Sequence, residues 1–268
     1  MATNESGFQL SEAGPGAYER YMVPVHCENR AIDLLDRVHV QPGEHVLDVA
    51  SGTGVVTRHA ARRVGSSGKV VGVELNPGMI EVALRASEFV DSIEYLEGDA
   101  SALPVTDASF DVALCQHALM FFPDREASVR ELHRALRPGG RAAISVFRTV
   151  EYNPAFGSLV TALERNTSEE AAAFMRSPFV MESVAQMRGL FEQAGFEEIC
   201  VLNRIETLRY PSIAHMVRYE TLNIPDPALQ SDAVQALLKA TISELVGASV
   251  DDQGIAFPSQ DFVVTARR

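Results

Sequence analysis

The chain has 268 residues, of which 46% are hydrophobic and 22% charged, values that suit a globular protein with a sizeable buried core. Its formal net charge of −13, without a cluster of Lys and Arg, argues against nucleic acid or an anionic membrane surface as a partner. No apolar run reaches the roughly 20 residues of a membrane span, and the N-terminal stretch lacks the pattern of a secretory signal, so we expect a cytoplasmic protein.

The predicted elements begin with helices over the N-terminal segment 1–40, where apolar residues keep helical spacing up to Val38. From residue 43 to 147, short apolar strands alternate with helices, the pattern of a parallel sheet covered on both faces. Helices are expected after Gly54, from Asn76, which can cap a helix followed by proline, and over 125–136. The predicted strands are 45–50, 70–74, 93–97, 110–116 and 141–147.

The regular alternation ends after residue 147. Residues 148–181 and 210–256 have helical patterns and are predicted to form insertions that cap the sheet. Between them we expect a helix over 182–194 and a strand within 196–208, and the chain closes with a strand at 261–267. The pattern predicts one α/β domain over residues 1–268, with the N-terminal helices as a lid. The three scattered cysteines show no metal-ligand spacing, and we predict no metal site.

The most informative stretch is a small-residue turn that joins the first strand to its helix, Ala50-Ser51-Gly52-Thr53-Gly54. Small residues let a ligand approach the backbone closely, and the following helix presents unpaired N–H groups at its N-terminus. Glycines also occur in tight turns for purely conformational reasons. The turn therefore indicates a ligand site only in combination with other features.

Two carboxylates are the other features that point to a ligand site. Glu74 ends the second strand, twenty residues beyond Gly54, at the spacing where an acid accepts hydrogen bonds from ribose hydroxyls; the alternative is a solvated charge at a helix start. Asp99 follows the third strand and could accept a bond from an exocyclic amine such as that of adenine; the alternative is an Asx turn. Because parallel strands end at one edge of a sheet, all three features converge there, which a purely structural domain would not explain.

The turn favours an adenosyl ligand over a dinucleotide. A dinucleotide fingerprint needs a third glycine where this chain has Thr57. Asp48 also places an acid where a pyrophosphate would need positive surroundings. An adenosyl ligand with a cationic ammonium and no phosphate fits better, and an NAD(P)-dependent oxidoreductase is the less favoured alternative.

Four segments resemble the successive motifs of class I S-adenosylmethionine-dependent methyltransferases, particularly the group related to the ubiquinone/menaquinone C-methyltransferases: residues 48–54, 74–76, 98–100 and 136–140. One departure is Ala50, where that family often has glycine. The resemblance implies a Rossmann-like, seven-stranded, mostly parallel sheet whose last strand is antiparallel, with helices on both faces and a helical cap. It also implies S-adenosyl-L-methionine as the cofactor.

The resemblance places Glu74 at the ribose, Asp99 and Ala100 at the adenine, and the glycine turn at the methionine portion. Leu75 and Asn76 would line the adenine pocket, and Gln116 would lie near the methionine end. The complete predicted cofactor-binding set is Asp48, Ala50, Ser51, Gly52, Thr53, Gly54, Glu74, Leu75, Asn76, Asp99, Ala100 and Gln116.

The predicted reaction is methyl transfer to a small organic acceptor (a phenol, quinol, enol or amine) by in-line displacement that yields S-adenosylhomocysteine. Much of the rate would come from orientation and exclusion of water. An alternative is an S-adenosylmethionine-binding protein that does not methylate, and a homodimer is considered for the assembly.

His117, after the fourth strand, is the candidate general base; the alternative is a structural histidine bonded to a loop carbonyl. Tyr21 is a second candidate, because the N-terminal segment of resembling proteins folds over the cofactor; Tyr18 and His26 share its segment. Aromatic residues and a methionine further suggest an apolar acceptor pocket, with ordinary core packing as the alternative: Phe121, Phe122, Phe156, Phe174, Met175 and Phe179.

Overall fold

The computed structural model describes residues 14–245 and 249–268. Its sheet runs in the order β3-β2-β1-β4-β5-β8-β6, with a short additional strand, β7, paired to β8. The strands are β1 (His45–Val49), β2 (Lys69–Glu74), β3 (Ile93–Glu97), β4 (Phe110–Gln116), β5 (Leu136–Phe147), β6 (Glu197–Tyr210), β7 (Ser249–Asp251) and β8 (Gly254–Arg267). β1 to β5 pair in parallel, whereas β8 is antiparallel to both of its long neighbours. The predicted Rossmann-like sheet is confirmed, with one short strand more than expected.

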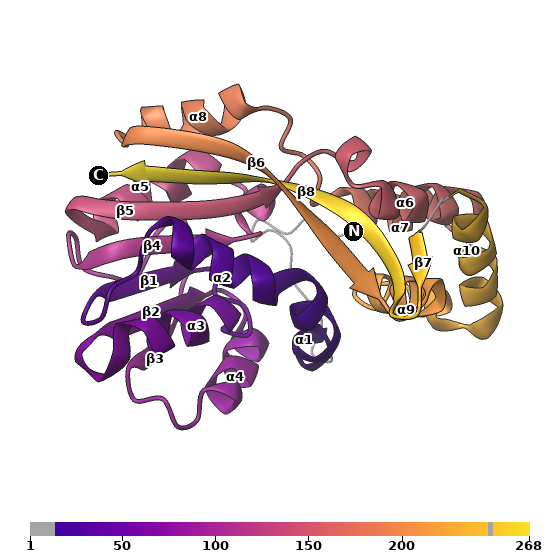
Figure 1. Cartoon of the computed structure of the whole chain (residues 1–268), viewed down its shortest axis with the longest axis horizontal. Coiled ribbons are helices and arrows are strands. Elements are labelled where there is room, and N and C mark those ends of the chain that lie inside the picture. Colours follow the sequence, from indigo (N-terminus) through magenta and orange to yellow (C-terminus); the bar gives the residue numbers. More distant parts are fainter. Residues whose placement is uncertain (1–13, 246–248) are drawn as a thin grey trace.

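Helices cover both faces of the sheet (Figure 1). α2 and α3 pack on one face, α5 and α8 on the other, and α4 lies against β2 and β3. The helices are α1 (Gly14–Ala17), α2 (Glu28–Arg37), α3 (Val55–Val64), α4 (Pro77–Ala86), α5 (Arg125–Ala135), α6 (Pro154–Asn166), α7 (Glu169–Arg176), α8 (Val184–Gln193), α9 (Ile213–Glu220) and α10 (Asp232–Leu245). Within the described ranges, no helix combines the length and apolar character needed to cross a bilayer.

The central strands are buried on both faces, which explains their continuous apolar sequences. Successive residues enter different cores: Val46 and Leu114 pack with α2 and α3, whereas Leu47 and Ala113 pack on the side of α5 and α8. The Asn76 side chain accepts hydrogen bonds from the backbone N–H groups of Gly78 and Met79, and so caps α4 as its position predicted.

β6 and β8 extend beyond the sheet as a two-stranded ribbon that reaches the helices of the cap (Figure 1). The pairing continues as far as Tyr210 opposite Ile255. Residues 148–181 form α6 and α7, and residues 210–256 include α9, α10 and β7. These helices and the end of the ribbon share a second hydrophobic core that includes Phe156, Leu208 and Met216.

The N-terminal segment was predicted to be helical, and its described part is helical but irregular. Tyr18–Cys27 is a π-helix with Pro24 inside it, and α2 follows as a separate element. Proline has no N–H to donate, so a regular α-helical ladder cannot continue through that position. Residues 1–13 of the predicted lid lie outside the described residues.

Candidate active site

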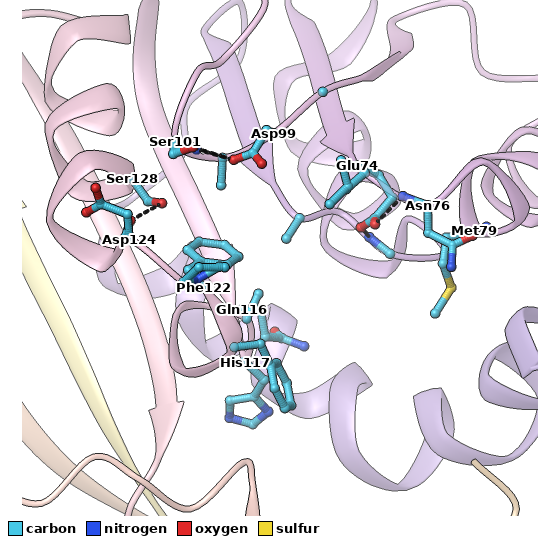
Figure 2. Close-up of a pocket in the computed structure, with 18 of the residues that line it drawn as sticks. Glu74, Asn76, Met79, Asp99, Ser101, Gln116, His117, Phe122, Asp124 and Ser128 are labelled. Atoms are coloured by element: carbon cyan, nitrogen blue, oxygen red, sulfur yellow. Dashed lines mark hydrogen bonds between the residues drawn. The ribbon is translucent and has the colours of Figure 1, made fainter. Parts of the chain in front are cut away.

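A cavity of about 360 Å³ opens at the carboxyl ends of β1, β2, β3 and β4. In Figure 2, Glu74, Asn76 and Met79 lie on one side of it, Asp99 and Ser101 on another, and Gln116 and His117 on a third. The turn and both predicted carboxylates therefore converge at one edge of the sheet. The predicted site residues that line this cavity are Ala50, Gly52, Glu74, Leu75, Asn76, Asp99, Ala100, Gln116 and His117.

Glu74 both faces the cavity and organises the glycine turn. Its Oε2 accepts a hydrogen bond from the Gly52 N–H at 2.9 Å, and its Oε1 accepts one from the Asn76 N–H at 2.9 Å. Burial raises the pKa of this carboxyl, against the opposing effect of the backbone hydrogen bonds. Each carboxylate oxygen retains further acceptor capacity toward the cavity. The contact with Gly52 was not foreseen from the sequence.

The turn after β1 requires left-handed backbone at three positions: Ala50, Gly52 and Gly54 have φ of +55°, +57° and +86°. At Gly52, a Cβ would meet open space, whereas at Gly54 it would overlap the Tyr95 hydroxyl. Ala50 adopts a conformation that favours glycine, which gives a physical reason for the glycine common at that position in the resembling family.

Four residues of the predicted cofactor set do not line the cavity: Asp48 in β1, and Ser51, Thr53 and Gly54 in the turn. Asp48 is buried and accepts a hydrogen bond from the Thr57 hydroxyl at 2.6 Å. Burial raises the pKa of Asp48 to about 7, although the Thr57 bond opposes that rise. Thr57, which replaces the third glycine of a dinucleotide motif, thus supports the turn from inside.

Asp99 forms the Asx turn that was one interpretation of its sequence, and its role at the adenine stays a prediction. Its Oδ1 accepts hydrogen bonds from the backbone N–H and the hydroxyl of Ser101, both at 2.7 Å, which is an Asx turn (Figure 2). The same carboxylate belongs to the cavity wall. The turn therefore fixes Asp99 in place without removing it from the site.

The side-chain amide of Gln116, at the end of β4, lines the first cavity. Its Nε2 donates to the Cys27 carbonyl at 3.2 Å. Its Oε1 is buried and finds no hydrogen-bond partner among the described residues. A buried acceptor of this kind suits a ligand that brings N–H donors, such as an ammonium group.

A second cavity, of about 140 Å³, adjoins the first, because Tyr18, His117 and Phe121 line both. Its walls are mainly apolar, with His26, Glu220 and Asn223 among the polar exceptions. Most of the predicted acceptor-pocket residues line it, namely Phe121, Phe156, Phe174, Met175 and Phe179, whereas Phe122 lines the first cavity.

His117 lies where the two cavities meet. Its backbone adopts φ of +49° and donates to the Ser145 carbonyl at 2.9 Å, while its ring stacks on Phe147 with centroids 4.0 Å apart. Nε2 lies 3.4 Å from Oδ2 of Asp261. Burial lowers the pKa of His117 to about 4 despite that carboxylate, so the imidazole is neutral near pH 7.

Asp261 remains ionised behind His117. Burial alone would raise its pKa, but the neighbouring His117 and Arg30 hold it well below its usual range. The Arg30 guanidinium donates to Asp261 at 2.7 Å from inside the core. Sequence reasoning missed Asp261, because His117 and Arg30 lie more than a hundred residues away from it along the chain.

Tyr21 lies outside both cavities. Its ring stacks on Tyr219 with centroids 4.3 Å apart. Tyr18, Met22 and His26 line the second cavity instead. Their spacing of four residues was the available sequence signal, since residues four apart share one face of a helix. Across the described part of the chain, no three His, Cys, Asp or Glu side chains are grouped so as to hold a metal ion.

Comparison with known proteins adds independent information. A model of the methyltransferase domain matches residues 47–144. Demethylmenaquinone methyltransferase of Staphylococcus epidermidis is 30% identical over 183 residues, which are 63% of this chain and 74% of the relative. Ubiquinone/menaquinone biosynthesis C-methyltransferase UbiE of Hahella chejuensis is 40% identical over 116 residues, 42% of this chain and 47% of the relative. A Haemonchus contortus phosphoethanolamine N-methyltransferase 2, solved with S-adenosyl-L-methionine, has a TM-score of 0.63 at 20% identity, covering 96% of this chain and 57% of that one.

The order of the sheet and the convergence of turn and carboxylates at its edge define a Rossmann-like α/β protein with a candidate ligand site at the carboxyl ends of its strands. The matches then specify the family: this chain belongs to the class I S-adenosylmethionine-dependent methyltransferases and is related to the ubiquinone/menaquinone C-methyltransferases. That membership favours a methyltransferase over the oxidoreductase alternative.

Proposed function

We propose that this enzyme methylates a small, largely apolar organic acceptor: a phenol, quinol, enol or amine. The observation that carries the proposal is the junction of two unlike cavities. The first has polar groups at the strand ends, the second has aromatic walls beneath the cap, and the two meet at Tyr18, His117 and Phe121. A donor and an apolar acceptor held there would be adjacent.

The residues of the first cavity fit the adenosyl cofactor. Gly52 leaves open the space that a Cβ would fill, and the Gln116 Oε1 is an unpaired acceptor for an ammonium. Glu74 would accept from the ribose hydroxyls, and Asp99 with Ala100 would hold the adenine. When bound, S-adenosylmethionine supplies an electrophilic methyl group attached to a sulfonium.

The chain's own residues orient the acceptor and exclude water. Phe156 and Phe179 pack with ring centroids 5.0 Å apart in the wall of the second cavity. A neutral His117 can accept a proton from an acceptor hydroxyl, and the Asp261 carboxylate behind it would stabilise the resulting imidazolium. With a pKa of about 4, His117 is a weak base in the free protein. Asp261 would stabilise the imidazolium more strongly once a bound acceptor excludes water, because charges interact more strongly at lower dielectric.

The direct test is formation of S-adenosylhomocysteine when the enzyme is incubated with S-adenosylmethionine and a panel of phenols, quinols, enols and amines. We expect turnover with at least one apolar aromatic member. His117→Asn, which tolerates the left-handed backbone, should lower turnover about 10²-fold or more with little change in cofactor affinity. Unchanged turnover in that variant would assign His117 a structural role.

A further inference from the structure

The second cavity contains a buried polar cluster that the transfer of a methyl group at His117 does not use. His26 comes from the N-terminal π-helix, Tyr210 from the end of β6, and Glu220 from the end of α9. All three are at most 6% exposed. Three elements distant in sequence thus bring an imidazole, a phenol and a carboxylate together, and His26 and Glu220 line the cavity.

The contacts determine the tautomer of His26. Tyr210 donates its hydroxyl proton to Glu220 Oε1 at 2.7 Å, and burial followed by the nearby carboxylate raises the pKa of Tyr210 well above its usual value, so it remains protonated. The Tyr210 hydroxyl also lies 3.1 Å from His26 Nε2, but its one proton is already given to Glu220. His26 Nε2, 2.8 Å from the same Glu220 oxygen, must therefore carry the hydrogen that it donates.

When the His26 imidazole carries only the Nε2 hydrogen, its other ring nitrogen, Nδ1, is an acceptor. Nδ1 is buried and has no hydrogen-bond partner among the described residues. A buried acceptor without a donor is costly, and in native proteins such groups are uncommon. Since the His26 side chain lines a cavity whose walls are mainly apolar, a ligand in that cavity can supply the missing donor.

We propose that His26 is a specificity residue: its Nδ1 accepts a hydrogen bond from a hydroxyl or N–H group on the acceptor. Glu220 and Tyr210 are positioning residues that hold the tautomer. His26 lines the second cavity but not the first, so this recognition acts on a part of the acceptor away from the cofactor. The inference rests on the proposed function, and it narrows the acceptors to apolar molecules with a hydrogen-bond donor.

The first test is a binding comparison on the full chain saturated with S-adenosylhomocysteine. The probes are 1-naphthol and 1-methoxynaphthalene, which share the ring system but differ in the donor. We expect the wild type to bind the naphthol about ten-fold more tightly or better, because a site built to accept a hydrogen bond discriminates against an analogue that lacks the donor. Equal binding of the two probes, or no binding of either, would overturn the proposal.

Variants assign the preference to this cluster. The variant combines His26→Phe with Glu220→Gln. The phenylalanine keeps a ring against Phe156, and the glutamine removes the carboxylate that would otherwise be buried without its histidine partner. We expect this variant to bind both probes equally. His59→Phe is the matched control, since His59 pairs with Glu28 outside both cavities, and it should keep the preference. A preference that survives the cluster variant would contradict the assignment.

A spectroscopic readout on the wild type avoids any loss of folding. The imidazole ¹⁵N spectrum should show the hydrogen of His26 on Nε2 and should move the Nδ1 resonance when 1-naphthol binds, but not when the ether does. A hydrogen on Nδ1, or an Nδ1 resonance that ignores naphthol, would overturn the inference. Failure of S-adenosylhomocysteine to bind, measured separately, would instead contradict the proposed function.

Discussion

Gly52 and Gly54 lie in the same turn and share a left-handed backbone, but their surroundings differ. Gly52 borders the cavity and donates its N–H to Glu74, whereas Gly54 packs against Tyr95. The sequence pattern predicted the turn because local spacing and residue size determine it. The different surroundings of its two glycines depend on packing from β2 and β3, which no local pattern reports.

Alanine substitutions should separate these surroundings. Gly52→Ala should cost about 1–2 kcal/mol for the left-handed backbone and weaken S-adenosylhomocysteine binding, because its Cβ enters the ligand's space. Gly54→Ala adds overlap with Tyr95 and should lower the free energy of unfolding further. Urea denaturation and ligand titration measure the two effects. Equal stability losses in both variants would contradict the account.

Asp48 should make stability depend on pH. Burial raises its folded-state pKa to about 7, against an ordinary value of about 4 in the unfolded chain. Between these values the folded state binds more protons, so the contribution of Asp48 to the free energy of unfolding falls as pH rises from about 4 to about 7. Asp48→Asn should remove this pH dependence. Over the whole range the change in the free energy of unfolding is at most about 4 kcal/mol, at about 1.4 kcal/mol per pKa unit. Urea denaturation of both proteins at several pH values tests this; parallel curves would refute it.

At the scale of elements, the buried side chain of Arg30 joins α2 to the ribbon of β6 and β8. Arg30 donates to Asp261 at 2.7 Å and to Ser259 at 3.0 Å on β8, and lies 3.1 Å from Glu206 on β6. Asp261 on the ribbon therefore contacts both Arg30 of α2 and the neutral imidazole of His117.

Loss of that cation should be far more costly than loss of a surface pair on the same helix. Arg30→Leu leaves Asp261 buried without its main partner and should lower the free energy of unfolding by about 3–5 kcal/mol. Arg37→Leu breaks a partly exposed pair with Asp33 and should cost about 0.5 kcal/mol or less. Urea denaturation compares them, and similar losses would show that the buried network contributes little.

Sequence predicted the central strands to within a residue or two, because burial on both faces leaves continuous apolar runs. The start of β5 was missed: the strand was predicted from residue 141, yet Leu136 already pairs with Phe110 across a register shift. The length of β8 was underestimated as well: it was predicted over 261–267 but begins at Gly254. Pro258, Ser259 and Gln260 interrupt the apolar pattern there, so the sequence does not indicate the first half of the strand.

At the scale of the whole molecule, the site lies at the junction of the sheet and the cap (Figure 1). Glu74, Asp99 and the glycine turn were predictable, because each depends on short spacing at a strand end. Glu220 and Asp261 were not, because their positions beside His26 and His117 follow from how the cap and β8 fold back on the sheet. Local sequence patterns thus indicate the first cavity, whereas the second cavity depends on tertiary structure.

The central claim is that the first cavity binds the adenosyl cofactor, and a calorimetric titration with S-adenosylhomocysteine tests it most directly. We predict one ligand per chain, binding weakened by about 1–3 kcal/mol in Glu74→Gln, which loses a charged acceptor, and no comparable binding of NADH. No binding of S-adenosylhomocysteine, an affinity unchanged in Glu74→Gln, or tighter binding of NADH would contradict it.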